Sequence, residues 1–323
     1  MKTGENHMQN EQIFKKILVP VDGSVPSTVA REFASSMAKQ FNSKVTVIHV
    51  VAHELMGPGA QKFTWPEDRH EHPRIGFSTG AAMSPSVHVP EAPDTPYSEQ
   101  IAREITNICR EEGEDILGDA LRALKEEGVN ADRKLVVEGD PASVILRVAE
   151  EGNYDIIIMG SSGEEEKEPH LGSVAKKVAH RAKIPVLIAR GKSGMSKILV
   201  PVDGSKYAGK AIQSAVALAK KAKANLTLLY VQESSIFRIR PEVSKEIGKR
   251  ILSDASAQVK GIEVEQKLES GDPAKIIIKT ANRGGHDLIV IGSRGHSTRE
   301  RFSLGNVSDH IVQYVDRSVL ITK

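Results

Sequence analysis

Hydrophobic and polar positions along the chain alternate between short apolar runs and longer segments with an apolar residue every three or four positions. The short runs are rich in Val, Ile and Leu, which is typical of parallel strands buried on both faces. The longer segments predict amphipathic helices, one of which carries Val29, Phe33, Met37 and Phe41 on a single stripe. Because the two patterns follow one another, the sequence predicts an α/β fold with helices on both faces of parallel sheets.

The predicted elements occur twice in the same order. In the first half we predict strands at 17–22, 45–51, 135–138, 155–159 and 185–189, and helices from 26 and at 98–127, 141–151 and 173–182. In the second half we predict strands at 198–203, 226–231, 263–268, 288–291 and 318–322, and a last helix at 307–315. Each half therefore predicts a doubly wound domain with a five-stranded parallel sheet.

An internal duplication explains the repeated order. The segment K-I-L-V-P-V-D-G-S occurs at 16–24 and again at 197–205, an offset of 181 residues. Further on, D-I-I-I-M-G-S-S-G at 155–163 corresponds to D-L-I-V-I-G-S-R-G at 287–295, an offset of 132 residues. Self-similarity of this kind indicates two related structural units, and the first is longer by 49 residues.

The duplication divides the chain into a first repeat at 13–191 and a second repeat at 192–323, behind a polar tail at 1–12 that we expect to be flexible. The surplus of the first repeat lies at 52–97, which holds seven of the fifteen prolines and no periodic apolar face. Such a segment indicates a loosely packed insertion that folding does not require, although a binding role for it stays open.

Composition narrows the class of protein. The net charge is +2 and basic residues are interspersed with acidic ones, which argues against a nucleic-acid-binding protein. Cys109 is the only cysteine, so an intrachain disulfide and a multi-cysteine metal site are excluded. No stretch approaches the roughly 20 apolar residues of a transmembrane helix, and no signal peptide is recognisable, so we expect a soluble, cytoplasmic protein without membrane partners.

Candidate chemistry gathers after the fourth predicted strand of the second repeat. Gly292 and Gly295 are followed, after nine further residues, by Gly305 at the start of the last predicted helix. Glycine lets backbone N–H groups approach an anion closely, and a helix N-terminus adds unpaired donors and partial positive charge. The same loop carries Arg294, His296, Arg299 and Arg301. The pattern predicts a phosphate site, although glycines that only form tight turns would look similar.

These linked features resemble the universal stress protein family, here as a tandem of two family domains. The resemblance rests on V-P-V-D-G-S after the first strand, G-D-P before the third helix, and the pattern G-x2-G-x9-G-(S/T) of ATP-binding members. The second repeat meets this spacing with Gly292, Gly295 and Gly305, while Asn306 replaces Ser or Thr. The resemblance implies a regulatory module of the stress response that binds ATP.

The resemblance also implies which residues hold the nucleotide. The backbone around Pro201 and Val202 would lie beside it, Asp203 would accept a ribose hydroxyl, and the backbone of Val231 would receive the adenine. The phosphates would be wrapped by Gly292, Ser293, Arg294, Gly295, His296, Gly305, Asn306 and Val307. ATP is the implied cofactor, and whether Mg2+ or Mn2+ accompanies it stays open. For Asp203 the alternative is a purely structural role in capping the following helix.

The first repeat keeps the equivalent aspartate, Asp22, but changes the loop. Its spacer between Gly163 and Gly172 has eight residues instead of nine, and four glutamates lie at 164, 165, 166 and 168. Carboxylates at these positions repel a polyphosphate. We therefore expect one ATP per chain, bound by the second repeat.

The family resemblance also implies how the two repeats are arranged. Since domains of this family often pair through their last strands, we expect an internal pseudo-dimer in which 185–189 and 318–322 cover each other's edges. Association of two chains into a homodimer stays open. A slow ATP hydrolase and a nucleotide-free interaction scaffold are the alternative functions. We predict no catalytic residue, because the loop lacks an evident base and no G-x4-G-K-(S/T) motif is present.

Overall fold

The computed structural model describes residues 13–51, 96–136, 139–162, 171–191, 193–233, 241–295 and 304–323. The first repeat consists of β1 (Lys16–Pro20), α1 (Val25–Phe41), β2 (Lys44–Val50), α2 (Pro96–Glu126), β3 (Ala131–Val136), α3 (Pro141–Glu151), β4 (Ile156–Gly160), α4 (Ser173–Arg181) and β5 (Val186–Ala189). The second repeat consists of β6 (Lys197–Pro201), α5 (Lys206–Ala222), β7 (Asn225–Glu233), α7 (Pro241–Ser256), β8 (Val264–Gly271), α8 (Pro273–Gly284), β9 (Leu288–Gly292), α9 (Asn306–Tyr314) and β10 (Ser318–Thr322).

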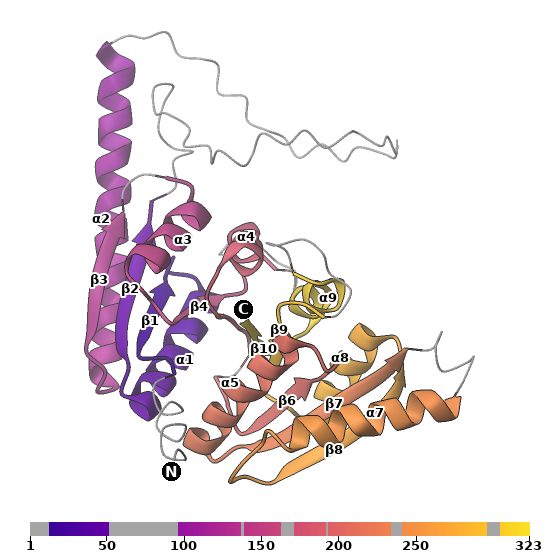
Figure 1. The fold of residues 1–323 in the computed structure, drawn as a ribbon. Coiled ribbons are helices and arrows are strands. Elements are labelled where there is room, and N and C mark those ends of the chain that lie inside the picture. The colour runs from indigo at the N-terminus through magenta and orange to yellow at the C-terminus, as the bar shows by residue number, and fades with distance from the viewer. Residues whose placement is uncertain are drawn as a thin grey trace, which may run out of the picture.

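The strands form one ten-stranded sheet with the order β3-β2-β1-β4-β5-β10-β9-β6-β7-β8 (Figure 1). Within each repeat all neighbouring strands are parallel, and only β5 and β10, which join the repeats, are antiparallel. Each half therefore has the predicted five-stranded parallel sheet. No helix within the described ranges is long and apolar enough to cross a membrane.

Two predicted boundaries differ clearly from the structure. The strand predicted at 135–138 begins at Ala131, because the charged residues 132–134 lie on the outermost strand, where solvent-facing charges are tolerated. Residues 96 and 97, predicted as the end of the insertion, form the first turn of α2. The remainder of the insertion and the predicted tail lie outside the described residues, so both remain predictions.

Two hydrophobic cores lie on opposite faces of the sheet, and each spans both repeats. Helices α1, α2, α5 and α7 cover one face, and α3, α4, α8 and α9 cover the other. In β1, Ile17 and Val19 enter the first core and Leu18 enters the second, as the two-residue period of a strand requires. All three side chains are fully buried. Burial on both faces explains why the strands appear in the sequence as continuous apolar runs.

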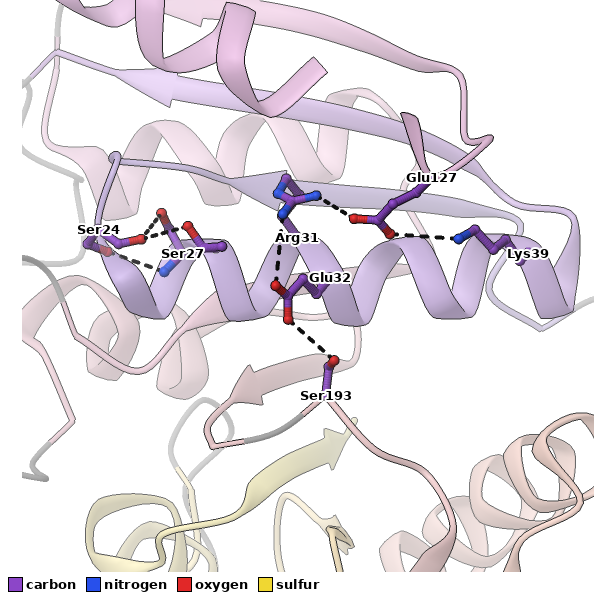
Figure 2. Close-up of polar contacts among 8 residues, drawn as sticks. Ser24, Ser27, Arg31, Glu32, Lys39, Glu127 and Ser193 are labelled. Carbon is purple, nitrogen blue, oxygen red and sulfur yellow. Dashed lines mark hydrogen bonds and ion pairs between the residues drawn. The ribbon is translucent and has the colours of Figure 1, made fainter. Parts of the chain in front are cut away.

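The duplicated motifs set the starts of helices. Ser24 caps α1 by accepting a hydrogen bond from the backbone N–H of Ser27 (Figure 2), and Ser205 caps α5 in the same way. Asp140 and Asp272 cap α3 and α8, and each is followed by proline in the first turn. D-G-S and G-D-P therefore specify local structure whether or not a ligand is present.

Polar contacts connect α1 with the end of α2 and with the segment between the repeats (Figure 2). Arg31 donates to Glu127 at 2.7 Å, and Lys39 lies 3.7 Å from the other carboxylate oxygen. Burial would raise the pKa of Glu127, but its hydrogen bonds and these two cations outweigh that effect and lower it. Glu32 accepts from the hydroxyl of Ser193 at 3.5 Å. Helix α1 thus contacts both neighbouring segments.

The repeats are joined by backbone pairing between β5 and β10. Val319 lies opposite Ile188, and Leu320 lies opposite Leu187, in an antiparallel register. All four side chains are fully buried. This pairing confirms the predicted contact between the last strands and leaves neither of them as an open sheet edge.

Two cations reinforce the junction from opposite sides. The buried Arg190, after β5, donates through Nη1 to the carbonyls of Val312 and Val315 at 2.6 and 2.9 Å. Lys323, its counterpart after β10, donates to the carbonyl of Ala179 at 2.6 Å. Burial lowers the pKa of Arg190 to about 10 and that of Lys323 to about 8. Each repeat therefore supplies a cation to the C-terminal end of a helix in the other, where carbonyls lack intrahelical donors.

We predict that Arg190→Met destabilises the protein by about 1–3 kcal/mol, because it leaves the carbonyls of Val312 and Val315 buried without this donor. Urea unfolding followed by circular dichroism measures the change. Lys183→Met is the control: its exposed ion pair with Glu150 spans 2.7 Å, and such pairs contribute at most about 1 kcal/mol. Equal effects of the two substitutions would contradict a special role for Arg190.

Candidate functional site

A cavity of about 420 Å³ opens at the carboxyl ends of β6, β7 and β9 in the second repeat. Strands β6 and β9 are neighbours, but the helices that follow them, α5 and α9, cover opposite faces of the sheet. Doubly wound sheets bind ligands at such a switch point. Ten of the twelve predicted nucleotide-binding residues line the cavity, namely Pro201, Val202, Asp203, Val231, Gly292, Arg294, Gly295, Gly305, Asn306 and Val307. His296, like Arg299 and Arg301, lies outside the described residues.

Ser293, the remaining predicted residue, does not line the cavity. It is buried, and its backbone N–H donates to the carbonyl of Thr322 on β10 at 2.8 Å. Its own carbonyl accepts from the backbone N–H of Gly305 at 2.8 Å. The structure therefore gives Ser293 a framework role, connecting the loop after β9 to β10 and to the start of α9.

Gly292 has a packing role in addition to the one predicted from the sequence. A Cβ at this position would lie 2.8 Å from the backbone carbonyl carbon of Tyr207, in the first turn of α5. The equivalent Gly160 of the first repeat would meet the backbone of Pro26 in α1 at 2.7 Å. The missing side chain thus allows close packing of strand and helix in both repeats. Gly292 also lines the cavity, so its contact with phosphate stays a prediction.

Gly295 brings the loop against Asp203. A Cβ on Gly295 would lie 2.6 Å from Oδ2 of Asp203. The other oxygen, Oδ1, accepts from the backbone N–H of Ser205 at 2.9 Å. Asp203 therefore has the structural role in the turn before α5, and its carboxylate also faces the loop at the cavity. The two interpretations weighed from the sequence are compatible.

Helix α9 directs its N-terminus into the cavity. Its cap residue, Gly305, has no side chain to satisfy the first turn, and the first intrahelical bond runs from Asp309 N–H to the carbonyl of Gly305 at 2.9 Å. The N–H groups of Asn306, Val307 and Ser308 therefore have no intrahelical acceptor. These three residues line the cavity. These N–H groups and the positive end of the helix dipole make this wall suitable for an anion.

Arg294 lines the cavity, and two further basic side chains, Lys206 and Lys323, lie near it without belonging to the lining. The Arg294 guanidinium lies over the ring of Tyr207, 5.8 Å from its centroid, and Lys206 Nζ lies 5.1 Å from that centroid. Burial is the main cause that lowers the pKa of Lys323, and the nearby positive charge of Arg294 is the second. The corresponding residues of the first repeat are Ser162, Pro26, Val25 and Arg190. Arg190 is the only basic residue of that set, so the electrostatic difference between the repeats extends beyond the loops compared in the sequence.

The opposite end of the cavity is mainly apolar. Val231, Ile247, Pro273 and Ile277 contribute to its lining, from β7, α7 and α8. Tyr230 lies there too, and the pKa of its hydroxyl is raised by burial and then by the carboxylates of Asp203 and Glu233. An apolar end and a cationic end suit a ligand that combines a flat hydrophobic group with phosphate.

The first repeat places a different side chain at the position of Tyr230. Aligned along β2 and β7, this residue is His49, whose Nδ1 lies 2.8 Å from the carbonyl of Val21 and donates to it. Val21 is the counterpart of Val202, which lines the cavity in the second repeat. In the first repeat, the His49 side chain therefore already occupies the backbone carbonyl of Val21, next to the position that corresponds to the cavity.

Carboxylates and imidazoles do not gather into a metal site in the described part of the chain. No group of three or more His, Cys, Asp or Glu side chains is arranged there to hold a metal ion. The loops at 163–170 and 296–303, which contain the acidic and basic residues compared in the sequence, lie outside the described residues.

The fold is that of a universal stress protein. The model of the universal stress protein family matches residues 13–190 and 195–323, so the chain belongs to this family as a tandem two-domain member. Universal stress protein YxiE of Bacillus subtilis is 38% identical over 147 residues, covering 40% of this chain and 99% of its own length. Universal stress protein Rv2005c of Mycobacterium tuberculosis is 24% identical over 332 residues, covering 95% and 96%.

The fold comparison agrees over the whole chain. The crystal structure of a universal stress protein from Archaeoglobus fulgidus aligns with a TM-score of 0.63 at 23% identity. The alignment covers 98% of this chain and 99% of that one. The likeness therefore includes both repeats.

We predict that Gly292→Ala and Gly160→Ala destabilise the protein by similar amounts, about 1–3 kcal/mol each, because the added methyl group meets helix backbone in both repeats. Gly209→Ala, within α5, is the matched control: its Cβ would meet only a Gln258 side-chain oxygen at 3.8 Å, so it should stabilise by about 0.5–1 kcal/mol. Urea unfolding compares the three. Loss of nucleotide binding in Gly292→Ala with unchanged stability would contradict the packing role and support the predicted phosphate contact.

Proposed function

We propose that this protein is a regulatory module of the universal stress protein family that binds one ATP molecule in its second repeat. The observation that carries this proposal is a cavity that has both an apolar end and an anion-binding end. Its size is within the usual range of small-molecule sites, roughly 300–1,000 Å³. The nucleotide follows from the chemistry of the two ends and from the family to which the chain belongs.

In the proposed complex, the adenine lies against the apolar end near Val231 and Ile277. Asp203, held by Ser205, accepts a ribose hydroxyl. The phosphates lie between Arg294 and the first turn of α9, where unpaired N–H groups and positive charge favour them. These assignments use groups that the structure already brings together around one cavity.

The first repeat is not a second ATP site in this proposal. It keeps Asp22, whose carboxylate accepts from Ser24, and so repeats the turn before the helix. It lacks the arginine of the loop, since Ser162 replaces Arg294, and His49 occupies the carbonyl of Val21. The repeats therefore share the turn but differ in the side chains that would contact a nucleotide, which is consistent with one bound nucleotide per chain.

The regulatory part of the proposal rests on α9, which contacts both the cavity and the first repeat. Its N-terminal turn lines the cavity, and Arg190 of the first repeat donates to its C-terminal carbonyls. In addition, His180 of α4 donates to Asp309, in the first turn of α9, at 2.8 Å. Occupation of the cavity would therefore act on a helix that the other repeat holds at both ends. We propose this link, rather than hydrolysis, as the use of ATP.

We predict a calorimetric stoichiometry near one ATP per chain. Asp203→Ala should weaken ATP at least about tenfold, which corresponds to about 1.4 kcal/mol, because a charged acceptor for the ribose is lost. Asp22→Ala, the equivalent change in the first repeat, is the matched control and should leave ATP affinity unchanged. Two bound nucleotides, or equal losses in both variants, would refute the assignment to the second repeat.

Arg294→Ala tests the position of the phosphates. We predict that it weakens ATP by about 1–2 kcal/mol and AMP by much less, because the guanidinium acts on the terminal phosphates and charge-assisted hydrogen bonds are strong. Parallel titrations with ATP, ADP, AMP and cyclic AMP measure the dependence on phosphate number. Equal weakening of ATP and AMP would mean that Arg294 acts through packing against Tyr207 instead.

A further inference from the structure

A second cavity of the second repeat lies apart from the nucleotide site. It encloses about 210 Å³ between β8, the outermost strand of the sheet, and α8. Its polar lining consists of Lys267, Glu269, Lys279, Thr280 and Arg283, and it shares no residue with the nucleotide cavity. Its chemistry can therefore be considered independently of the proposed ATP binding.

The lining carries excess positive charge. Lys279 and Arg283 are one helical turn apart on α8, and Lys267 lies across from them on β8. Lys267 is 3.3 Å from Glu265, but Lys279 and Arg283 have no carboxylate within 4 Å in the described part of the chain. Glu269 is the single acidic residue of the lining. Two cations thus lie beside a concave surface without an acidic partner.

Helix stability accounts for only part of this arrangement. Arg283 lies in the last turn of α8, where a cation interacts favourably with the helix dipole. That interaction does not explain why Lys267 of β8 and Thr280 of α8 line the same cavity.

The first repeat keeps part of this lining. By sheet register and sequence alignment, Lys134 and Arg147 stand where the second repeat has Lys267 and Lys279. Val136, Val148 and Glu151 stand where it has Glu269, Thr280 and Arg283. The combination of Arg283 with Thr280 and Glu269 is therefore specific to the second repeat.

We propose that this cavity binds a small phosphomonoester that carries a free hydroxyl group. A phosphate presents several oxygens, which the Arg283 fork, the two ammonium groups and the Thr280 hydroxyl can satisfy together. Glu269 can only accept when ionised, so it selects a ligand that offers a hydroxyl donor. Ile276 supplies an apolar contact for the carbon skeleton. The cavity is smaller than the roughly 300 Å³ at which drug-sized sites begin, which favours a compact ligand.

Calorimetry with glycerol 3-phosphate, inorganic phosphate and glycerol tests the proposal on the full chain at low ionic strength. We expect saturable binding of glycerol 3-phosphate, weaker binding of phosphate and none of glycerol. Lys279→Ala and Arg283→Ala should each weaken glycerol 3-phosphate at least about tenfold. Lys275→Ala is the matched control, because this exposed lysine is one turn earlier on α8 and does not line the cavity, and it should change affinity less than about twofold.

Two further variants separate the remaining outcomes. Asp203→Ala, in the nucleotide cavity, should leave binding of glycerol 3-phosphate unchanged. Loss of binding in this variant would place glycerol 3-phosphate in the nucleotide cavity and overturn the proposal. Glu269→Gln should reduce the preference for glycerol 3-phosphate over phosphate. The proposal is also overturned by absence of saturable binding, by a Lys275→Ala effect equal to that of Lys279→Ala, or by an unchanged preference in Glu269→Gln.

Discussion

The antiparallel pairing of β5 with β10 is the interaction on which the rest of this structure depends. Without it, each repeat would expose the edge of a five-stranded sheet, with unpaired backbone N–H and C=O groups. With it, ten strands form one sheet, and the hydrophobic cores on both faces continue from one repeat to the other. Arg190 and Lys323 follow directly after the paired strands, so the pairing also places them at helix ends of the opposite repeat.

This junction extends to the candidate nucleotide site through α9. The helix has nine residues, so its ends are only about 13 Å apart. One end presents N–H groups without an intrahelical acceptor to the cavity, and the other end is held by Arg190. A short helix is stiff along its axis, so in the proposed ATP complex a displacement of its N-terminus would have to be accommodated at the junction. The proposed regulation uses this connection between the repeats, although the cavity itself is lined by the second repeat.

The sequence predicted those features that depend on local pattern. Buried strands were recognisable because both of their faces are apolar, and the duplication revealed the two domains. The start of β3 was missed because Asp132, Arg133 and Lys134 lie on an edge strand that solvent reaches. The site was predicted in outline from motif spacing, but spacing does not show where a Cβ would point. For this reason the packing role of Gly292, whose missing side chain admits α5, was not predicted, while its contact with phosphate stays a prediction. The apolar end, formed partly by Ile247 and Ile277, was not predicted because these residues belong to helices that meet only in the folded protein.

Comparison of the repeats separates residues that serve the fold from residues that serve a ligand. Gly160 and Gly292 are the same residue because both admit a helix, and both repeats retain the aspartate and serine that shape the turn before it. Where packing imposes no such demand, the repeats differ: Ser162 corresponds to Arg294, and His49 corresponds to Tyr230. These differences coincide with the two ends of the cavity, the cationic and the apolar. The duplicated fold therefore constrains the framework, while the chemistry of the site varies at positions that the framework leaves unconstrained.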